Sequence, residues 1–322
     1  MTAVNTAPFQ LPMGKATREA YGDALLEIGK HDQQIVAIDA DLAKSTFSWT
    51  FGKQFPERFF NIGIQEADMV GVASGLASSG KIPFISSFSA FVLGKGFDQL
   101  RMGAAYPHLN VKVAGSHGGI SIGEDGVSQQ SVEDVALACA LPGFIVCIPS
   151  DEHSMRAAVR AAAAHKGPVY LRLGRPKAMG VHAPAVAFAF GKAIPLRQGK
   201  DVTIVANGLL VAQALIAAHE LAGRGIEARV LDMHPVKPID AAALTRAATD
   251  TGAIVVAEEH VHSGGLGAAV SQALAASTPA PVEFVDLGDR YAESGKPEDL
   301  MKKYGLLAGD VRAAVERVLA RK

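Results

Sequence analysis

The sequence predicts an α/β protein of two three-layer domains, the first built on a mostly parallel sheet and the second smaller. Its 322 residues are enough for two domains of ordinary size. Apolar runs of strand length alternate throughout with longer segments of helical period. Most strand candidates are continuous apolar runs, which is typical of parallel strands covered by helices on both faces.

The domain boundaries follow from a change of character in residues 177–200. This segment contains several Gly and Pro residues and has no strong period, so we interpret it as a linker with some short strands. We assign residues 1–15 to an N-terminal extension, 16–176 to the first domain and 201–322 to the second.

The composition excludes some classes of protein. Hydrophobic residues make up 49% and charged residues 20% of the chain, as in globular rather than disordered proteins. The formal net charge is −1, which gives no reason to expect nucleic acid or an anionic membrane surface as a partner. The histidines are scattered without metal-ligand spacing, so no metal site is expected within this chain.

The cysteines and the N-terminus bear on localisation. Cys139 and Cys147 lie in apolar surroundings, which favours free thiols and a reducing compartment. The N-terminal extension lacks the basic stretch and long apolar core of a signal peptide. No uncharged apolar run approaches the length of a membrane span. We therefore expect a cytoplasmic protein.

The first domain is expected to open with a helix over 16–30 and a strand over 34–39. Apolar residues recur on one face of the helix, and Thr17 lies near its start. The strand is an apolar run that ends in a polar loop over 41–45.

A carboxylate lies between the next strand and the next helix. Residues 59–64 are a short apolar run that predicts a buried strand, and residues 67–77 carry apolar and small residues at helical spacing. Glu66 lies between them, where a carboxylate is out of place unless it is paired or used. The alternative is an ordinary acidic residue in the first turn of a helix, which the helix dipole favours.

The rest of the first domain alternates in the same way. Apolar runs predict four further strands, over 82–87, 111–115, 144–149 and 169–173. Helical spacing predicts three further helices, over 88–106, 132–140 and 151–164. Asp151 is expected near the N-cap of the last helix.

The second domain repeats the alternation of strand and helix. Its predicted strands cover 201–206, 228–233, 253–257 and 282–287. Its predicted helices cover 210–222, 241–248, 264–276 and 311–319.

Function in open parallel sheets lies beyond the C-terminal ends of the strands. Four features of the first domain directly follow predicted strands: Glu66, Phe88, the loop 116–130 and Arg175. We expect them to converge on one edge of the sheet.

The loop 116–130 reads SHGGISIGEDGVSQQ, in which glycines space out His117, Glu124 and Asp125. Such loops can hold an anion on backbone N–H groups, but they are also ordinary surface turns. The loop is neither a GxGxxG motif nor a Walker A motif, so it predicts neither a dinucleotide nor ATP.

Two aromatic and two basic residues have alternative interpretations. Phe88 and Phe91 are spaced i, i+3 at the start of a helix, either as a core pair or as cofactor contacts near Glu66. Arg18 and Arg175 are candidate phosphate ligands, because guanidinium matches phosphate geometry. Each of the two arginines could instead be a solvated surface charge.

The sequence as a whole resembles the C-terminal half of transketolase, with motifs in the order and spacing of that family. The motifs of the first domain are GIQEADM around Glu66, FISSFSAF with FDQLRM, GSHGGISIGEDGVSQQSVED and LRLGRPK. Further matches extend over nearly the whole chain: ATREAYGDAL, DADLAKSTF, DMHPVKPID, EEHVHSGGLGAAV and SGKPEDL. The shorter, animal-type transketolases are the most similar, because they carry Gln at the position of Gln129, where the bacterial and yeast type carries His.

The resemblance implies a pyrimidine-binding domain for thiamine diphosphate, followed by a transketolase C-terminal domain. Glu66 corresponds to the glutamate that contacts N1′ of the aminopyrimidine. A carboxyl group there can share a proton with N1′ and favour the imino tautomer, whose 4′-nitrogen takes the proton from C2 of the thiazolium. Phe88 and Phe91 correspond to aromatic residues at the aminopyrimidine ring.

The resemblance also implies a substrate site. His117 corresponds to a catalytic residue near the acceptor chain and its phosphate, Asp125 to a residue at a sugar hydroxyl, and Gln129 to one near the reacting centre. The sugar phosphate would be held by a group that corresponds to Arg18, Ser45 and Arg175.

One motif of the family is missing. Transketolases bind Mg²⁺ and the diphosphate through a GDG…N motif in an N-terminal domain, and the Gly-Asp pairs at 22–23 and 309–310 are not followed by the second Gly. The resemblance therefore implies half of a split enzyme. Mg²⁺ would be held mainly by a separate N-terminal transketolase subunit, in an assembly of two of each chain.

The implied reaction is transfer of a two-carbon ketol unit from a ketose phosphate to an aldose, as in the pentose phosphate pathway. One alternative is half of another thiamine diphosphate enzyme, such as deoxyxylulose-phosphate synthase or the β subunit of a 2-oxo-acid dehydrogenase. The sugar-phosphate group argues against it. Another alternative is a non-catalytic homologue that only binds a partner, and the retention of Glu66 with both aromatic residues argues against that.

Overall fold

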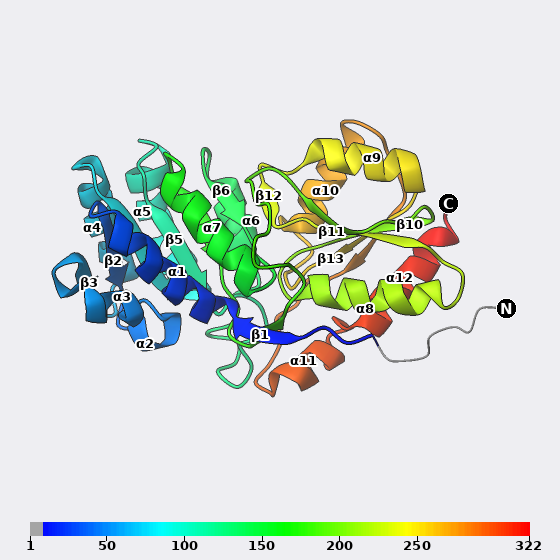
Figure 1. Ribbon diagram of the computed structural model, residues 1–322, viewed down its shortest axis with the longest axis horizontal. Coiled ribbons are helices and arrows are strands. Elements are labelled where there is room, and N and C mark those ends of the chain that lie inside the picture. The colour runs from blue at the N-terminus through cyan, green and yellow to red at the C-terminus, as the bar shows by residue number, and fades with distance from the viewer. Residues whose placement is uncertain (1–8) are drawn as a thin grey trace.

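The structure, a computed structural model, describes residues 9–322 and consists of two α/β halves that lie side by side (Figure 1). Each half has a mostly parallel sheet with helices on both faces, so the predicted fold class is confirmed. Of the predicted N-terminal extension, residues 1–8 lie outside the described residues, and Met13–Ala16 form the short strand β1.

The larger sheet has seven strands in the order β12-β6-β7-β5-β4-β2-β3. Neighbouring strands are parallel except for β12 against β6. The strands are β2 (Ile35–Asp39), β3 (Phe59–Asn61), β4 (Ile82–Phe88), β5 (Lys112–Ser116), β6 (Ile145–Cys147), β7 (Val169–Arg172) and β12 (Pro235–Lys237). Every residue of β2, β4, β5, β6 and β7 is buried, which explains why the sequence shows apolar runs rather than alternation.

Helices cover both faces of the larger sheet. One face carries α1 (Thr17–His31), α3 (Trp49–Gln54) and α7 (Glu152–Ala164). The other face carries α4 (Glu66–Ser78), α5 (Ser89–Gln99) and α6 (Asp134–Ala140). In Figure 1, α1 and α7 cross in front of the strands. Two short pieces precede β3, the helix α2 (Ala43–Thr46) within the predicted polar loop and a 3-10 turn over Pro56–Arg58.

The predicted helix over 88–106 is α-helical only as far as Gln99. It continues as a π-helix over Leu100–Ala105. Leu100, Ala104 and Ala105 are all buried, so the wider turn keeps apolar residues on the face toward the core.

The smaller sheet has five strands in the order β14-β13-β10-β11-β9, of which only β9 is antiparallel. The strands are β9 (Ile194–Arg197), β10 (Val202–Ala206), β11 (Ala228–Asp232), β13 (Ile254–Ala257) and β14 (Val282–Val285). Around them lie the helices α8 (Leu210–Ala222), α9 (Ala241–Thr251), α10 (Leu266–Ala275), α11 (Pro297–Lys303) and α12 (Ala308–Leu319). Figure 1 shows α9 and α10 on one side of this sheet and α8 and α12 on the other.

The two halves share a core. The strand β12 follows β11 of the second half, yet it pairs with β6 at the edge of the larger sheet. One cluster of buried side chains contains Val113 and Val146 from the larger sheet together with Val205 and Val256 from the smaller. The halves are therefore separate in sequence but packed as one body.

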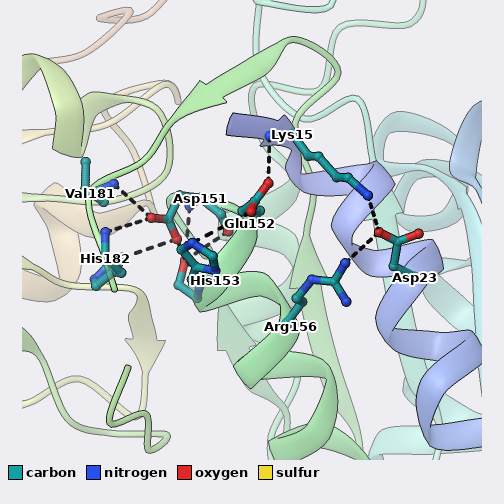
Figure 2. A network of polar contacts seen from close by, with 9 residues as sticks. Lys15, Asp23, Asp151, Glu152, His153, Arg156, Val181 and His182 are labelled. Atoms are coloured by element: carbon teal, nitrogen blue, oxygen red, sulfur yellow. Dashed lines mark hydrogen bonds and ion pairs between the residues drawn. The ribbon is translucent and has the colours of Figure 1, made fainter. Parts of the chain in front are cut away.

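The segment 177–200 is held by strand pairing at both ends, as the prediction of short strands within a linker allowed. Near its start β8 (Lys177–Met179) pairs with β1, and near its end β9 pairs with β11. Between them, the backbone N–H groups of Val181 and His182 donate to Oδ2 of Asp151 at 2.9 and 2.8 Å. Figure 2 shows these contacts at the start of α7, where Asp151 also caps the helix as predicted by accepting from the N–H of Ser154.

Two kinds of feature are absent from residues 9–322. No helix in this part of the chain is long and apolar enough to cross a membrane. The same residues contain no group of three or more His, Cys, Asp or Glu side chains placed to hold a metal ion. Cys147 is buried, Cys139 is partly buried, and both are free thiols.

Candidate active site

The C-terminal edge of the larger sheet brings together residues that are far apart in the sequence. The parallel strands β2, β4 and β5 end there at Asp39, Phe88 and Ser116. Because α1 and α4 begin at the same edge, Arg18 and Glu66 meet these strand ends. The predicted convergence is thus seen in direct contacts, described in turn below.

Glu66 is the first residue of α4, and it is buried with only 1% of its surface exposed. Its Oε1 accepts a hydrogen bond at 3.0 Å from Oγ of Ser87, the next-to-last residue of β4. Its Oε2 is buried and has no hydrogen-bond partner. The ammonium group of Lys95 faces this oxygen at 3.6 Å, as an ion pair longer than a hydrogen bond. One carboxyl oxygen is therefore fixed and the other is available.

Three rings stack beside this carboxyl group. The ring centroids of Phe88 and His117 are 3.8 Å apart, and those of Phe88 and Phe91 are 5.6 Å apart, with small interplanar angles. Lys95 covers Phe91, with its Nζ 4.5 Å from the ring centroid. The stack links the Glu66 region to the basic residues on the far side of His117.

His117 follows β5 in the left-handed backbone region, with φ of 62°, and is buried. Its Nε2 lies 3.3 Å from NH1 of Arg18, which can only donate, so Nε2 is the acceptor. Its Nδ1 lies 2.8 Å from Oγ of Ser116 and therefore carries the proton in the neutral ring. Burial, reinforced by the charges of Arg18 and Arg175, lowers the pKa of His117 to about 3. The imidazole is neutral at physiological pH.

Arg18 lies in the first turn of α1 and has a partner on each side. Its NH1 donates to the backbone carbonyl of Ser45 at 2.9 Å as well as to His117, and its guanidinium lies 5.3 Å from the ring centroid of Phe47. Its Nε is buried without a hydrogen-bond partner. Burial and then the charge of Arg175 lower the pKa of Arg18. Two guanidinium groups thus repel one another here, as expected where an anion is to be bound.

Ser45 belongs to α2, which a buried carboxylate holds in place. Asp39, at the end of β2, accepts hydrogen bonds from the hydroxyl groups of Thr46 and Ser48 and from the N–H of Leu42. Burial raises the pKa of Asp39 to about 6 in spite of these hydrogen bonds. The contact of Ser45 with Arg18 therefore depends on Asp39.

The loop 116–130 places its predicted residues less closely. Arg175 donates to the carbonyl of Ile122 at 2.5 Å and pairs with Glu124 at 3.0 Å. Asp125 is exposed at the tip of the loop, near enough to Arg18 to influence its pKa. Gln129 is partly exposed, and its amide oxygen accepts from Ser128 rather than from another site residue. Asp125 and Gln129 therefore lie on the rim of the site.

Four residues that contact the site were not singled out from the sequence as site residues: Ser87, Lys95, and Ser116 and Glu124 within the loop 116–130, which was expected at this edge only as a whole. Ser87 is the last residue of one predicted strand and Ser116 directly follows another, a position that could have marked them. Lys95 follows Phe91 by four residues on a predicted helix, so its spacing also gave a usable signal. The pairing of Glu124 with Arg175 spans 51 residues and leaves no sequence signal.

The residues fit part of a thiamine diphosphate site. The free Oε2 of Glu66 and the ring face of Phe91 suit a nitrogen heterocycle, and the free Nε of Arg18 beside Arg175 suits an anion. The diphosphate of the cofactor would need Mg²⁺, for which residues 9–322 offer no ligand cluster.

The fold defines the class of the protein first. A solved structure described as a split gene transketolase, inactive beta4 tetramer, superimposes with a TM-score of 0.88 over 95% of this chain and 99% of that one, at 48% identity. Two families match the sequence: the transketolase pyrimidine binding domain over residues 13–180 and the transketolase C-terminal domain over residues 191–311. The chain belongs to the transketolase family, and the resemblance noted in the sequence is confirmed.

Two curated relatives of similar length match nearly the whole of this chain. The 6-deoxy-6-sulfo-D-fructose transketolase subunit of Clostridium sp. strain MSTE9 is 43% identical over 316 residues, which cover 98% of both chains. A putative transketolase C-terminal section of Methanocaldococcus jannaschii is 40% identical over 91% of this chain and 92% of its own. Human transketolase is 38% identical over 95% of this chain, but the match covers only 49% of the human protein. The chain corresponds to the C-terminal part of transketolase.

Proposed function

We propose that this chain is the C-terminal subunit of a split transketolase, which transfers a two-carbon ketol unit from a ketose phosphate to an aldose. The observation that carries the proposal is the meeting of Glu66, the ring stack and Arg18 at one sheet edge. When bound, thiamine diphosphate supplies the electron sink that cleavage of a carbon–carbon bond requires. The residues of this chain position the cofactor and the substrate.

Glu66 is proposed to contact N1′ of the aminopyrimidine through its free Oε2. Because Ser87 holds the other oxygen, the carboxyl group cannot rotate away, and burial excludes competing water. Phe91 is proposed to pack against the aminopyrimidine ring, and Phe88 supports Phe91 by stacking. A carboxyl group so placed can hold and return the proton that the reaction moves at N1′.

Arg18 and Arg175, with Ser45, are proposed to bind the anionic end of the sugar. A tetrahedral anion would relieve the repulsion between the two guanidinium groups and use the unpartnered Nε of Arg18. Ser116 fixes the Nδ1 proton of neutral His117, so Nε2 would accept from a sugar hydroxyl once NH1 of Arg18 turns from it to the anion. Asp125 and Gln129 would approach the sugar from the rim.

The nature of the anion is part of the proposal. The Clostridium relative is named for a sulfonated fructose. Sulfonate and phosphate are both tetrahedral anions that two guanidinium groups can bind. We therefore propose a ketose with a terminal phosphate or sulfonate as donor, and not only the sugars of the pentose phosphate pathway.

The diphosphate and Mg²⁺ are proposed to be held by a second chain that carries a GDG…N motif. Support comes from relatives of equal length that are named as a subunit or a C-terminal section. An assembly of two of each chain would place the aminopyrimidine pocket of this chain against the diphosphate domain of the other. The structural relative described as an inactive tetramer is consistent with a subunit that needs its partner.

Isothermal titration and a ketol-transfer assay test the proposal together. The chain alone is expected to bind thiamine diphosphate and Mg²⁺ weakly, because residues 9–322 contain no cluster of side chains placed to hold the metal ion. Addition of a GDG-containing partner should produce both tight binding and transfer from ketose phosphates or 6-deoxy-6-sulfo-D-fructose. Tight Mg²⁺-dependent binding by this chain alone, or transfer without a second polypeptide, would contradict the split arrangement.

A further inference from the structure

Lys95 lies where the proposed aminopyrimidine would lie. Its Nζ is 3.6 Å from Oε2 of Glu66 and 4.5 Å from the ring centroid of Phe91. These are the carboxyl oxygen and the aromatic ring that the proposed function gives to the cofactor. We propose that Lys95 is a displaceable counter-ion of Glu66, which must leave this carboxyl group when the aminopyrimidine enters. The inference rests on the proposed function, because it needs a heterocycle to enter.

The packing of two helices brings Lys95 to this position. Lys95 follows Phe91 by one helical turn on α5, so both side chains lie on the same face of the helix. The next residue, Gly96, packs closely against α4, where a Cβ would lie 3.2 Å from Cγ2 of Val70 and 3.5 Å from the carbonyl oxygen of Glu66. This close approach carries the Lys95 side chain across to the carboxyl group.

In the free chain a nearby positive charge stabilises the buried carboxyl group of Glu66. Its Oε2 is buried and accepts no hydrogen bond, because Ser87 serves only Oε1. A buried carboxylate oxygen without a partner is costly, and a nearby ammonium group reduces that cost. Lys95 thus compensates for a partner that is missing from the free chain.

The contact between Lys95 and Glu66 is weak enough to be displaced by a ligand. The Lys95 side chain is 53% exposed, so its charge can return to water at little cost. The separation of 3.6 Å is too long for a hydrogen bond. A Cβ placed on the neighbouring Gly94 would meet no atom within 4 Å, which leaves open space beside Lys95 into which its long side chain can turn. An ammonium group and an aromatic ring cannot share one face of Phe91, so entry of the ring requires this turn.

Replacement of Lys95 tests the displacement through binding alone. Lys95→Met keeps the length and the apolar stem but removes the charge. Thiamine serves as the probe, titrated into the full-length chain and followed by ligand-observed NMR. The dissociation constant is expected to fall about 5- to 30-fold, since an exposed ion pair and a cation–π contact need no longer be broken. Lys81→Met, an exposed lysine beyond the other end of α4, is the matched control and should leave the constant unchanged.

Chemical labelling gives a second measurement that needs no variant. Limiting acetic anhydride should modify Lys95 slowly relative to Lys81 in the free chain, and saturating thiamine should raise the Lys95 rate without changing that of Lys81. Weaker or unchanged thiamine binding by Lys95→Met, or protection of Lys95 by thiamine, would overturn the displacement while leaving the cofactor assignment intact. Failure of thiamine to bind to any of the three proteins, with or without a GDG-containing partner, would overturn the proposed cofactor and this inference with it.

Discussion

Burial decides the charge of single residues at the candidate site. The same edge holds a neutral histidine, His117, and a buried carboxyl group, Asp39, whose pKa is raised to about 6. Arg18 stays charged at neutral pH, as arginine does in folded proteins, but burial has removed part of its hydration. The site therefore presents two guanidinium groups and a neutral imidazole toward the proposed anion.

Glu66→Gln is the first test at the scale of residues. An amide keeps the shape of the carboxyl group and can still accept from Ser87, so the chain should fold normally. It cannot exchange a proton with a heterocyclic nitrogen. Turnover of the enzyme assembled with its partner should fall by about 10²- to 10⁴-fold, the range for a positioned acid–base group. The control is Glu57→Gln, in which the replaced side chain is 67% exposed; turnover near that of the control would refute the assignment.

Arg175→Ala tests whether the basic pair binds an anion. Removal of a charged hydrogen bond costs about 1.5–3 kcal/mol. The KM for a phosphorylated or sulfonated donor should therefore rise by about 10- to 150-fold, while that for an uncharged ketose changes little. Alanine at the exposed neighbour Lys177 is the control. Equal losses with charged and uncharged donors would show that Arg175 does not contact the anion.

Some residues of the candidate site could be read from the sequence and others could not. Glu66, Phe88 and His117 follow strands, so the rule for parallel sheets places them at one edge, and their contacts agree. The ion pair of Lys95 with Glu66 depends on how closely α4 approaches α5, which sequence spacing within either helix does not encode. The roles of Asp125 and Gln129 rest on the family resemblance alone, because their side chains stay on the rim.

At the scale of elements, the length of a helix or strand decided whether the sequence could predict it. Long helices such as α1 and α7 and fully buried strands carry a clear period or a continuous apolar run. The strand β12 has three residues and begins with Pro, and α11 has seven residues, so neither shows a period. The π-helix after α5 shares the residue types of the α-helix before it, so composition does not separate the two.

Two helical glycines provide a matched test of element packing. A Cβ on the buried Gly22 of α1 would lie 2.6 Å from the Cβ and the carbonyl oxygen of Phe47, whereas one on the exposed Gly75 of α4 would meet nothing within 4 Å. Gly22→Ala should therefore destabilise the chain by about 1–3 kcal/mol. Gly75→Ala should stabilise it by about 0.5–1 kcal/mol.

Urea unfolding of both variants measures these changes in the free energy of unfolding. Gly22→Ala should also weaken anion binding, because Phe47 joins α2, which carries Ser45, to α1, which carries Arg18. Equal effects of the two substitutions on stability would contradict the packing of α2 against α1.

At the scale of the whole molecule, His182 joins the two halves. Its side chain is 2% exposed, with Nδ1 3.2 Å from Oδ1 of Asp151 in the first half and Nε2 3.2 Å from Oδ2 of Asp232 in the second. Figure 2 shows His182 beside Asp151 at the start of α7. Ser150 donates a further hydrogen bond to Asp232 at 2.7 Å. One residue of the linker thus bridges a helix cap and a strand end.

The charges of this bridge give stability a defined dependence on pH. Burial opposes protonation of the imidazole, but the hydrogen bond to Asp151 and the nearby carboxylate of Asp232 outweigh it and raise the pKa of His182 to about 9. Burial would raise the pKa of Asp151, yet His182 and the N–H groups at the helix start hold it below its usual range. A histidine with a raised pKa stabilises the folded state fully below its unfolded pKa, and this contribution is lost as pH rises through 9. Asp151 acts at the acid end, where its contribution is lost as pH falls below its ordinary pKa.

The last prediction follows from that sign. Between pH 6.5 and 10 the wild-type chain should lose about 3 kcal/mol of unfolding free energy relative to His182→Gln, which is the rise in the pKa of His182 expressed as energy. His182→Gln cannot be protonated, so it should be less stable than wild type at pH 6.5 and should approach wild type at pH 10. The control is His262→Gln, which replaces a histidine whose side chain is 52% exposed and paired with Asp286, and which should leave the pH dependence unchanged. Urea titrations at both pH values measure all three chains, and parallel curves for wild type and His182→Gln would show that the bridge carries no charge.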